Sequence, residues 1–321
     1  MKVLVTGGLG FIGSNFILEA LKRYPNWKIV NVDAKLLGSN SQNLNSANNN
    51  KNYKFVHGNI TNQKLMDKLI SNADIVFNFA AESHVDRSIT NPKPFIDSNF
   101  MGVYTILESI RRYKKKLIQV STDEVFGSLM SGSADEHHVL NPSSPYSSSK
   151  ASAELLARSY FVTYGIDVVI TRCTNNFGPR QFPEKLIPKV IMLADTGKEI
   201  PVYGSGKQVR DWIYVSDHCN AVLKVFEKGK IGESYNIAGH NEYDNNTIVH
   251  MILKIMEKPT TLIKHVIDRP GHDFRYSLDS SKIEKKLKWK PEHNLDSGLE
   301  KTIKWYLENK SWWKNISKLN F

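Results

Sequence analysis

Short runs of β-branched and apolar residues alternate with segments of helical periodicity from the first residue to about Ile170. Such alternation is typical of βαβ units, which build a parallel sheet. The predicted strands are residues 2–6, 28–33, 53–57, 75–79, 117–121 and 168–173. The predicted helices between them are residues 12–23, 63–71, 95–113 and 147–164.

After Asn176 the alternation gives way to pieces punctuated by Pro and Gly, among which residues 247–256 and 299–308 keep a helical period. This change predicts two regions, a larger one over residues 1–176 and a smaller one mainly over 177–321. We expect the chain to return to the first region near residues 209–240, a return that begins with a segment such as 211–215. The Asn-rich residues 39–52 are expected to form an exposed loop.

The composition is that of an ordinary globular protein with an excess of positive charge. Of the 321 residues, 40% are hydrophobic and 23% are charged, and 43 Lys and Arg against 32 Asp and Glu give a net charge of +11. That length excludes a peptide or a minimal binding module. The charge alone leaves four interpretations open: a nucleic-acid partner, an anionic membrane surface, a phosphorylated substrate, or a Lys-rich solvated surface. The basic cluster 111–116 falls at a predicted helix C-terminus, where cations complement the helix dipole.

Only two cysteines are present, Cys173 and Cys219, and neither has a Cys or His at ligand spacing. We therefore expect no disulfide framework and no metal site. No stretch approaches the roughly 18 apolar residues of a membrane span, and the N-terminal apolar run is short for a signal peptide. These features favour a soluble cytoplasmic protein.

A glycine-rich turn follows the first predicted strand and opens the first helix. Gly7, Gly10 and Gly13 stand at the spacing GxxGxxG, which allows a tight turn and lets a pyrophosphate approach the amides of a helix N-terminus. Asp33 ends the second strand, 20 residues after Gly13, where a carboxylate can hydrogen-bond a ribose 2′-hydroxyl. A carboxylate repels a 2′-phosphate, so NAD is favoured over NADP, although Lys35 stands nearby. The pattern predicts a Rossmann-type, doubly wound parallel α/β sheet.

Tyr146, just before the predicted helix 147–164, and Lys150, within it, place a phenol and an ammonium four residues apart. Lys150 can depress the pKa of Tyr146, and the resulting phenolate can take a proton from a substrate hydroxyl as a hydride leaves for a nicotinamide. The YxxxK spacing also occurs by chance in many helices, but here it follows a dinucleotide signature. Thr122 stands directly after the preceding predicted strand.

Two adjacent carboxylates, Asp123 and Glu124, follow Thr122 directly. Out of context such a pair is most simply a solvated acidic surface. In the run 122–127, TDEVFG, it resembles the TDEVYG motif of the nucleotide-sugar 4,6-dehydratases of the extended short-chain dehydrogenase/reductase family. Further segments similar to that family lie at residues 80–88, 175–179, 182–188, 209–212 and 268–273.

The resemblance implies a cycle of oxidation, elimination and reduction on dTDP-glucose or UDP-glucose. Tyr146 and Thr122 serve C4 oxidation, Glu124 removes the C5 proton and Asp123 protonates the leaving C6 hydroxyl. The hydride then returns to C6, so NAD is expected to be tightly bound and recycled. The resemblance also implies deoxysugar synthesis of the rhamnose type, a smaller C-terminal α/β substrate-binding domain, and a homodimer through helices 95–113 and 147–164.

Binding residues are carried over on the same basis. The implied cofactor-binding residues are Gly7, Gly10, Phe11, Ile12, Gly13, Asp33, Asn59, Ile60, Ala80, Ala81, Ser98, Tyr146, Lys150 and Asn176. The implied substrate-binding residues are Ser83, Thr122, Asn175, Lys185, Leu186, Pro201, Val202, Tyr203, Arg210, Asn245, Asp268, Arg269 and His272. The chain departs from the family pattern at Asn59, where Asp is usual, and at Phe126 and Phe177, where Tyr is common.

Three alternatives remain at this point. A nucleotide-sugar 4-epimerase or decarboxylase shares the fold, but the acid pair argues against both. A basic RNA-binding protein on a dinucleotide fold would need no complete acid–base set, and a catalytically silent scaffold would not need to keep one. The nucleobase stays open between thymine and uracil, because one methyl group contributes only about 1–3 kcal/mol in an apolar pocket.

Overall fold

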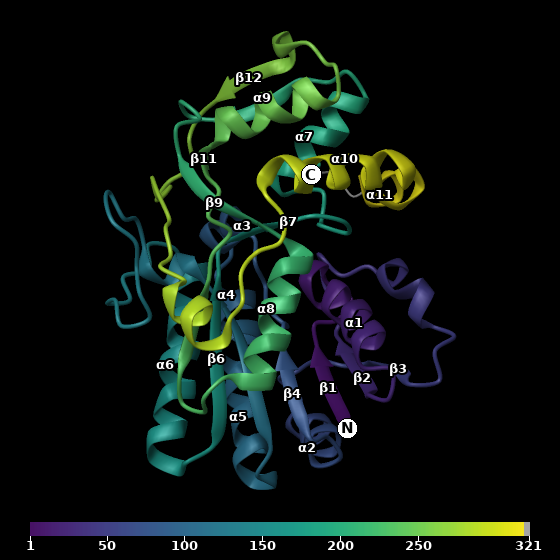
Figure 1. The fold of residues 1–321 in the computed structure, drawn as a ribbon, viewed down its shortest axis with the longest axis vertical. Coiled ribbons are helices and arrows are strands. Elements are labelled where there is room, and N and C mark those ends of the chain that lie inside the picture. Colours follow the sequence, from purple (N-terminus) through teal and green to yellow (C-terminus); the bar gives the residue numbers. More distant parts are fainter. Residues whose placement is uncertain (318–321) are drawn as a thin grey trace.

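The computed structural model describes residues 1–317, so residues 318–321 of the Lys-rich C-terminal segment lie outside the described part. Figure 1 shows a large α/β layer that contains the N-terminus and a smaller layer stacked on one end of it. No helix within residues 1–317 is long and apolar enough to cross a bilayer.

The large layer is built on a seven-stranded parallel sheet with the order β10-β6-β5-β4-β1-β2-β3. The strand order reverses between β1 and β4, which creates the crevice where doubly wound sheets bind ligands. The predicted Rossmann-type sheet is therefore confirmed. Its strands are β1 (Lys2–Thr6), β2 (Lys28–Asp33), β3 (Tyr53–His57), β4 (Ile75–Asn78), β5 (Lys116–Thr122), β6 (Asp167–Cys173) and β10 (Ser234–Ile237).

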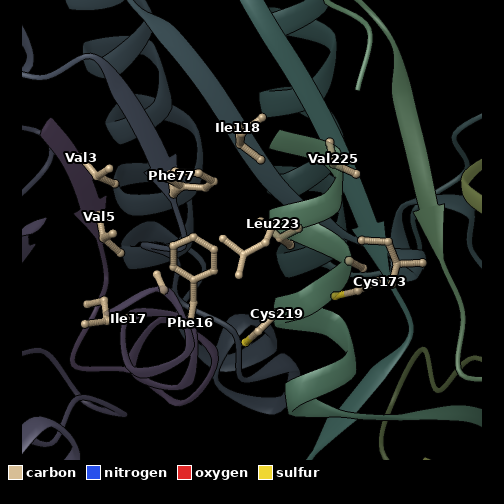
Figure 2. Packing of buried hydrophobic residues seen from close by; sticks show 14 of the residues in the cluster. Val3, Val5, Phe16, Ile17, Phe77, Ile118, Cys173, Cys219, Leu223 and Val225 are labelled. Atoms are coloured by element: carbon tan, nitrogen blue, oxygen red, sulfur yellow. The ribbon is translucent and has the colours of Figure 1, made fainter. Parts of the chain in front are cut away.

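Helices cover both faces of this sheet, and each face has its own apolar core. On one face α1 and α8 pack together over Phe16, Phe77 and Leu223, as Figure 2 shows. Cys173 and Cys219 lie in this core as free, buried thiols. The other face is covered by α2, α5 and α6. The bounds are α1 (Phe11–Arg23), α2 (Gln63–Ser71), α5 (Gly102–Tyr113), α6 (Pro145–Tyr164) and α8 (Val215–Lys228).

Within the described residues, the smaller layer holds two short sheets and four helices around a third core. One sheet has the order β11-β9-β7, and the other pairs β12 with β8. The strands are β7 (Asn175–Phe177), β8 (Ile200–Tyr203), β9 (Val209–Tyr214), β11 (Glu242–Asp244) and β12 (Ile263–Val266). The helices are α7 (Leu186–Asp195), α9 (Asn245–Ile255), α10 (Leu295–Glu308) and α11 (Lys310–Ser317).

The chain returns to the large layer later than the sequence suggests. The strand β9, expected to begin the return, pairs with β7 and β11 instead of joining the seven-stranded sheet. The return begins at α8, which packs on α1, and continues to β10, which pairs with β6. The residue pattern of a buried strand does not indicate which of two sheets the strand joins, so the pairing of β9 could not be predicted from the sequence.

The Asn-rich segment is only in part the exposed loop expected from its composition. A 3₁₀ helix (Ser41–Ala47) buries Asn43, Leu44 and Ala47 against α1. The indole of Trp312 donates a hydrogen bond to Asn43 Oδ1 at 2.8 Å. The expectation is therefore wrong for these three residues, whereas the other residues of 41–52 are exposed or partly exposed.

The helix predicted over residues 95–113 is divided. It consists of α4 (Lys93–Phe95), a π-helical turn (Ile96–Met101) and α5. A π-turn inside a helix often marks a functional site, and the one here faces the crevice described below. The remaining short elements are α3 (Val85–Thr90) and the helical turns Asp123–Phe126, Thr260–Leu262 and Ile283–Leu287.

Candidate active site

A pocket opens at the carboxyl ends of β1, β4 and β5, at the reversal of the strand order. All fourteen residues predicted to bind the cofactor line it, from Gly7 at the first turn to Asn176 on β7. The acid–base residues Thr122, Asp123 and Glu124 line the same pocket, and so do Ser83, Asn175 and Lys185. The structure thus brings together residues that are up to 178 positions apart, and the large layer supplies most of them.

The glycine turn packs too closely against neighbouring backbone to hold larger residues. A Cβ atom on Gly7, whose φ is +71°, would lie 2.6 Å from the backbone of Ala80, and one on Gly13 would lie 2.4 Å from Gly7 O. The N-cap of α1 is Gly10, so no side chain caps the first amides of this helix. These amides and the helix dipole suit a pyrophosphate.

At the end of β2, the carboxylate of Asp33 is held by its neighbours. It accepts hydrogen bonds from the amides of Leu9 and Lys35 at 3.0 and 2.8 Å and from the hydroxyl of Ser39 at 2.8 Å. These bonds orient a buried carboxylate at the rim of the pocket. The glycine turn and Asp33 together fit the dinucleotide that the sequence predicts.

The phenol and the ammonium lie in the first turns of α6. A capping box between Ser144 and Ser147 fixes the start of this helix, and its side chain–amide bond is 3.1 Å long. Lys150 Nζ donates to the carbonyl of Val120 at 2.8 Å, and burial lowers the pKa of Lys150 to about 8. The helix thereby presents both groups to the pocket from a fixed position.

The pKa of Tyr146 moves in the direction opposite to the one predicted from the YxxxK spacing. Burial and then the charge of Glu124 raise the pKa of this phenol well above its ordinary value, and the hydroxyl of Thr122 opposes the rise. The side chains of the protein by themselves therefore do not produce a phenolate.

The adjacent acids are presented by a 3₁₀ turn that follows β5 directly. Thr122 Oγ1 donates to Asp123 Oδ1 at 3.0 Å and accepts from the amide of Glu124 at 3.3 Å. Asp123 is only 3% exposed, and its Oδ2 atom finds no hydrogen-bond partner within the described chain. A buried oxygen without a partner in a pocket is suited to meet a ligand.

The environments of the two acids differ. Burial and the charge of Glu124 raise the pKa of Asp123 well above its ordinary value. Burial also raises the pKa of Glu124, but the charges of Lys185, Arg269 and Arg210 work against it. Asp123 is therefore suited to hold a proton and Glu124 to give one up, the division that paired acid–base chemistry requires.

A loop between β4 and α3 forms the opposite wall of the pocket. Asn99, in the π-helical turn, accepts from the amide of Glu82 at 2.8 Å and donates to its carbonyl at 3.0 Å and to Ser149 at 2.9 Å. Asn99 is not among the residues predicted from the sequence, although its neighbour Ser98 is. Across the pocket, Lys185 Nζ donates to the carbonyl of Ser83 at 2.7 Å.

The wall also carries a charged group that the sequence analysis did not assign. Arg87 pairs with Glu184 at 2.8 Å, and both residues line the pocket together with His84. Burial and the charge of Lys185 lower the pKa of His84 to about 3, so this imidazole is neutral. The segments 80–88 and 182–188 had marked this neighbourhood without naming these side chains.

The remaining predicted substrate residues lie in the smaller layer, beyond the residues that line the pocket. Arg210 is 5% exposed, donates to the carbonyls of Val209, Asp273 and Phe274, and lies 4.3 Å over the ring of Tyr276. Those bonds hold the guanidinium in place by main-chain contacts alone.

After β12, the loop with Asp268, Arg269 and His272 follows, and His272 Nδ1 lies 2.6 Å from Asp268 Oδ1. On β8, the side chain of Val202 is buried in the core of the smaller layer, which leaves only its main chain for a ligand. The other predicted positions occupy element ends: Leu186 and Asn245 begin α7 and α9, and Pro201 and Tyr203 lie on β8.

Comparison with known proteins places this fold and site in a family. A family model described as GDP-mannose 4,6 dehydratase matches residues 4–302. The chain belongs to this family. Membership confirms the resemblance noted in the sequence, and the family accounts for nearly the whole described chain, the smaller layer included.

The chain is similar to individual relatives over nearly the whole length of both proteins. The dTDP-glucose 4,6-dehydratase of Escherichia coli is 43% identical over 98% of this chain and 96% of the relative. The dTDP-glucose 4,6-dehydratase of Bacillus anthracis, solved in complex with NAD, is 45% identical, with a TM-score of 0.93 over 98% of this chain and 99% of that chain.

Two further structures show how widely the fold is shared. The dTDP-glucose 4,6-dehydratase of Streptomyces venezuelae, solved with NAD bound, is 41% identical, with a TM-score of 0.97 over 98% of this chain and 100% of that chain. The UDP-glucose 4-epimerase of Thermotoga maritima has a TM-score of 0.90 at 28% identity over 97% of this chain and 100% of that chain. Fold alone therefore does not separate dehydratase from epimerase, and the site must do so.

Proposed function

We propose that the protein is an NAD-dependent nucleotide-sugar 4,6-dehydratase that converts dTDP-glucose or UDP-glucose to the 4-keto-6-deoxyglucose nucleotide. The observation that carries this proposal is the pair Asp123 and Glu124, which lines one pocket with Tyr146 and Lys150. Relatives named dTDP-glucose 4,6-dehydratase, 43–44% identical over 98% of the chain, support the same assignment.

Residues of the large layer hold NAD in this proposal. The amides that follow Gly10 bind the pyrophosphate, and Asp33 accepts a hydrogen bond from a ribose hydroxyl. Bound NAD would supply the hydride acceptor for oxidation at C4 and the hydride donor for reduction at C6, and its positively charged ring would favour the phenolate form of Tyr146. We expect it to stay tightly bound and to be recycled.

The protein's own groups carry the proton transfers. Tyr146 takes the proton of the sugar 4-hydroxyl while Thr122 holds the oxygen. The ketone formed at C4 acidifies the C5 proton, which Glu124 removes. Asp123, kept protonated by burial, gives its proton to the departing C6 hydroxyl, which leaves as water, and Glu124 later returns a proton to C5.

The cations of the smaller layer complete the site. Lys185, Arg210 and Arg269 all influence the carboxyl of Glu124, which places three positive charges near it. A nucleoside diphosphate is negatively charged, and an arginine guanidinium or a lysine ammonium binds such a group well. We assign cofactor binding to residues 1–176 with the returning segment within 209–240, and nucleotide-sugar binding mainly to residues 177–321.

A 4-epimerase of the same fold is the nearest competing function. An epimerase needs only oxidation and reduction at C4, and it has no use for an acid that protonates a leaving group at C6. Incubation of the protein and NAD with dTDP-glucose and with UDP-glucose, followed by mass analysis, tests the proposal. We expect a product one water lighter than the substrate, and the ratio of the two rates identifies the nucleobase. A product of unchanged mass would support an epimerase instead.

Assembly and setting are part of the same proposal. Exposed apolar side chains gather on α5 and α6 or next to them, and they include Met101, Tyr104, Leu155, Val162 and Tyr164. Such side chains suit a homodimer interface formed by these two helices. The free thiols fit a cytoplasmic enzyme, and a 4-keto-6-deoxy product suits deoxysugar synthesis such as that of rhamnose.

A further inference from the structure

The short helix α3 contacts both layers of the protein. Toward the large layer, the hydroxyl of Ser88 accepts a hydrogen bond from the amide of Tyr146 at 3.2 Å, and Val85 packs in one cluster with Phe95 and Tyr146. Toward the smaller layer, Asp86 reaches the β8–β12 sheet. One helix therefore supports the predicted catalytic phenol and meets the predicted substrate layer.

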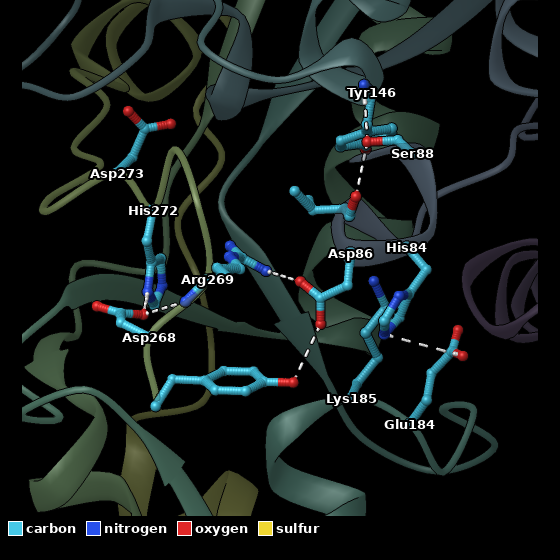
Figure 3. Close-up of polar contacts among 12 residues, drawn as sticks. His84, Asp86, Ser88, Tyr146, Glu184, Lys185, Asp268, Arg269, His272 and Asp273 are labelled. Atoms are coloured by element: carbon cyan, nitrogen blue, oxygen red, sulfur yellow. Dashed lines mark hydrogen bonds and ion pairs between the residues drawn. The ribbon is translucent and has the colours of Figure 1, made fainter. Parts of the chain in front are cut away.

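Asp86 uses both oxygens of its carboxylate for this second contact. Oδ1 pairs with Arg269 Nη1 at 2.9 Å, as Figure 3 shows. Oδ2 accepts a hydrogen bond from the hydroxyl of Tyr203 at 3.2 Å. Tyr203 ends β8 and Arg269 lies three residues beyond β12, so one side chain ties both strands of that sheet to α3. Burial acts to raise the pKa of Asp86, but the hydrogen bond and charge of Arg269 outweigh it and lower the pKa, so the carboxylate is charged.

The contact fixes one side of the Arg269 guanidinium and leaves the other available. Nη1 is bound by Asp86, whereas Nε is buried and finds no hydrogen-bond partner in the described part of the chain. Nε and Nη2 together form the edge with which an arginine grips a phosphate through two parallel hydrogen bonds. A buried donor without a partner beside a predicted anion site is accounted for if an anion binds it.

We propose that Asp86 is a positioning residue for the nucleotide diphosphate, because it holds Arg269 by Nη1 and thereby presents the Nε–Nη2 edge to a phosphate. Through Tyr203 it also ties the β8–β12 sheet to α3. The inference rests on the proposed function and extends it, because it assigns a role to a carboxylate that is not itself expected to touch the anion.

Steady-state kinetics of Asp86→Asn test this role, because the change removes the charge and keeps the volume of the side chain. We expect the KM for the nucleotide-glucose to rise about tenfold, with kcat within about twofold of wild type and an unchanged affinity for NAD. Glu199→Gln is the matched control. It breaks the exposed Lys264–Glu199 pair of 2.8 Å beside the same two strands and should leave the KM as it is.

A double-mutant cycle separates positioning from a general structural effect. In an Arg269→Gln background, Asp86→Asn should raise the KM little further, because the group that it positions is already gone. Asp86→Glu should restore part of the loss, and Tyr203→Phe should cause a smaller one. An unchanged KM in Asp86→Asn, or losses that simply add in the double variant, would overturn the inference.

The positioning role of Asp86 can be tested even if the proposed reaction is not found. If the wild-type protein formed no 4-keto-6-deoxy sugar, the proposed function would fail. Calorimetric titration with dTDP and UDP would still test the positioning role. A tenfold weaker affinity in Asp86→Asn supports it, and equal affinities contradict it.

Discussion

The hydroxyl of Thr122 donates a hydrogen bond to one oxygen of Asp123 at 3.0 Å, while the other oxygen is buried and finds no partner among the residues described. The first contact fixes the carboxyl at the end of β5, and the second leaves an acid group free to meet a ligand. Glu124, the next residue, lies under the influence of three cations. Adjacent positions in the sequence thus have different electrostatic environments, which is what a dehydration with one acid and one base requires.

Removing the base should block exchange at C5 without loss of the cofactor. In Glu124→Gln we expect NAD binding to be retained and the release of deuterium from 5-deuterated nucleotide-glucose to slow by a factor of about 100 to 10,000, the usual contribution of a positioned base. Mass analysis of the recovered sugar measures the release. A wild-type rate of release would remove Glu124 from this role.

Tyr146→Phe should nearly abolish the first hydride transfer, because the change removes the hydroxyl proposed to take the proton of the sugar 4-hydroxyl. The ring remains, so its contacts with Phe95 and Val85 are preserved and the fold should be unaffected. Stopped-flow absorbance of NADH in a single turnover measures the step. A normal rate in the folded variant contradicts the assignment.

The raised pKa of Asp123 has a consequence for stability. Because the folded-state pKa exceeds the unfolded value, the contribution of this carboxyl is fully present below the unfolded pKa and is lost as the pH rises toward the folded one. Asp123→Asn is always neutral, so its stability relative to wild type should grow with pH, by up to about 1.4 kcal/mol per unit. Urea unfolding of both proteins at pH 4, 6 and 8 checks this. A difference in the free energy of unfolding that is constant with pH would show that folding does not raise the pKa of Asp123.

A buried ion pair links β6 to the helix α6, which carries the phenol proposed to be catalytic. Glu154, one turn after Lys150 on α6, binds Arg172 of β6 at 2.7 Å, with side chains 3% and 7% exposed. Glu154→Gln strands a buried guanidinium and should cost about 3–5 kcal/mol in the free energy of unfolding. Replacing both residues with Met should cost clearly less. If the double change costs as much as the single one, the stranded charge is not the cause.

The proposed dimer can be tested on the exposed face of α6. Leu155 is 58% exposed, and Leu155→Glu would bring a charge into the interface. We expect the wild-type protein to sediment as a dimer at micromolar concentration and Leu155→Glu as a monomer. Leu307→Glu makes the same change on α10, in the smaller layer, and should leave the dimer intact. A monomeric wild type would refute the dimer.

Local patterns predicted much of the large layer. The strands β1, β2 and β3 and the helix α2 lie at the predicted residues. Each of these segments has a clear hydrophobic periodicity and is bounded by turn-forming residues. The pocket also unites the predicted cofactor residues with the acid pair, because the carboxyl ends of parallel strands share one edge of the sheet.

What the sequence could not predict depends on distant partners. Asn43 accepts a hydrogen bond from Trp312, which is 269 positions away, and Asp86 pairs with Arg269 across 183 positions. No periodicity within a short window encodes such contacts. The pKa of Tyr146 is a similar case, because burial by the folded chain outweighs the effect expected from Lys150, four residues away.

The central claim is that one hydride moves from C4 to C6 of the same sugar and that NAD is restored at the end of each cycle. Nucleotide-glucose carrying deuterium at C4, incubated with the protein and NAD, tests it directly. We predict that the deuterium appears in the C6 methyl group of the 4-keto-6-deoxy product and that no NADH accumulates. Deuterium found in released NADH, or retained at C4 of a sugar that has lost no water, would contradict the account.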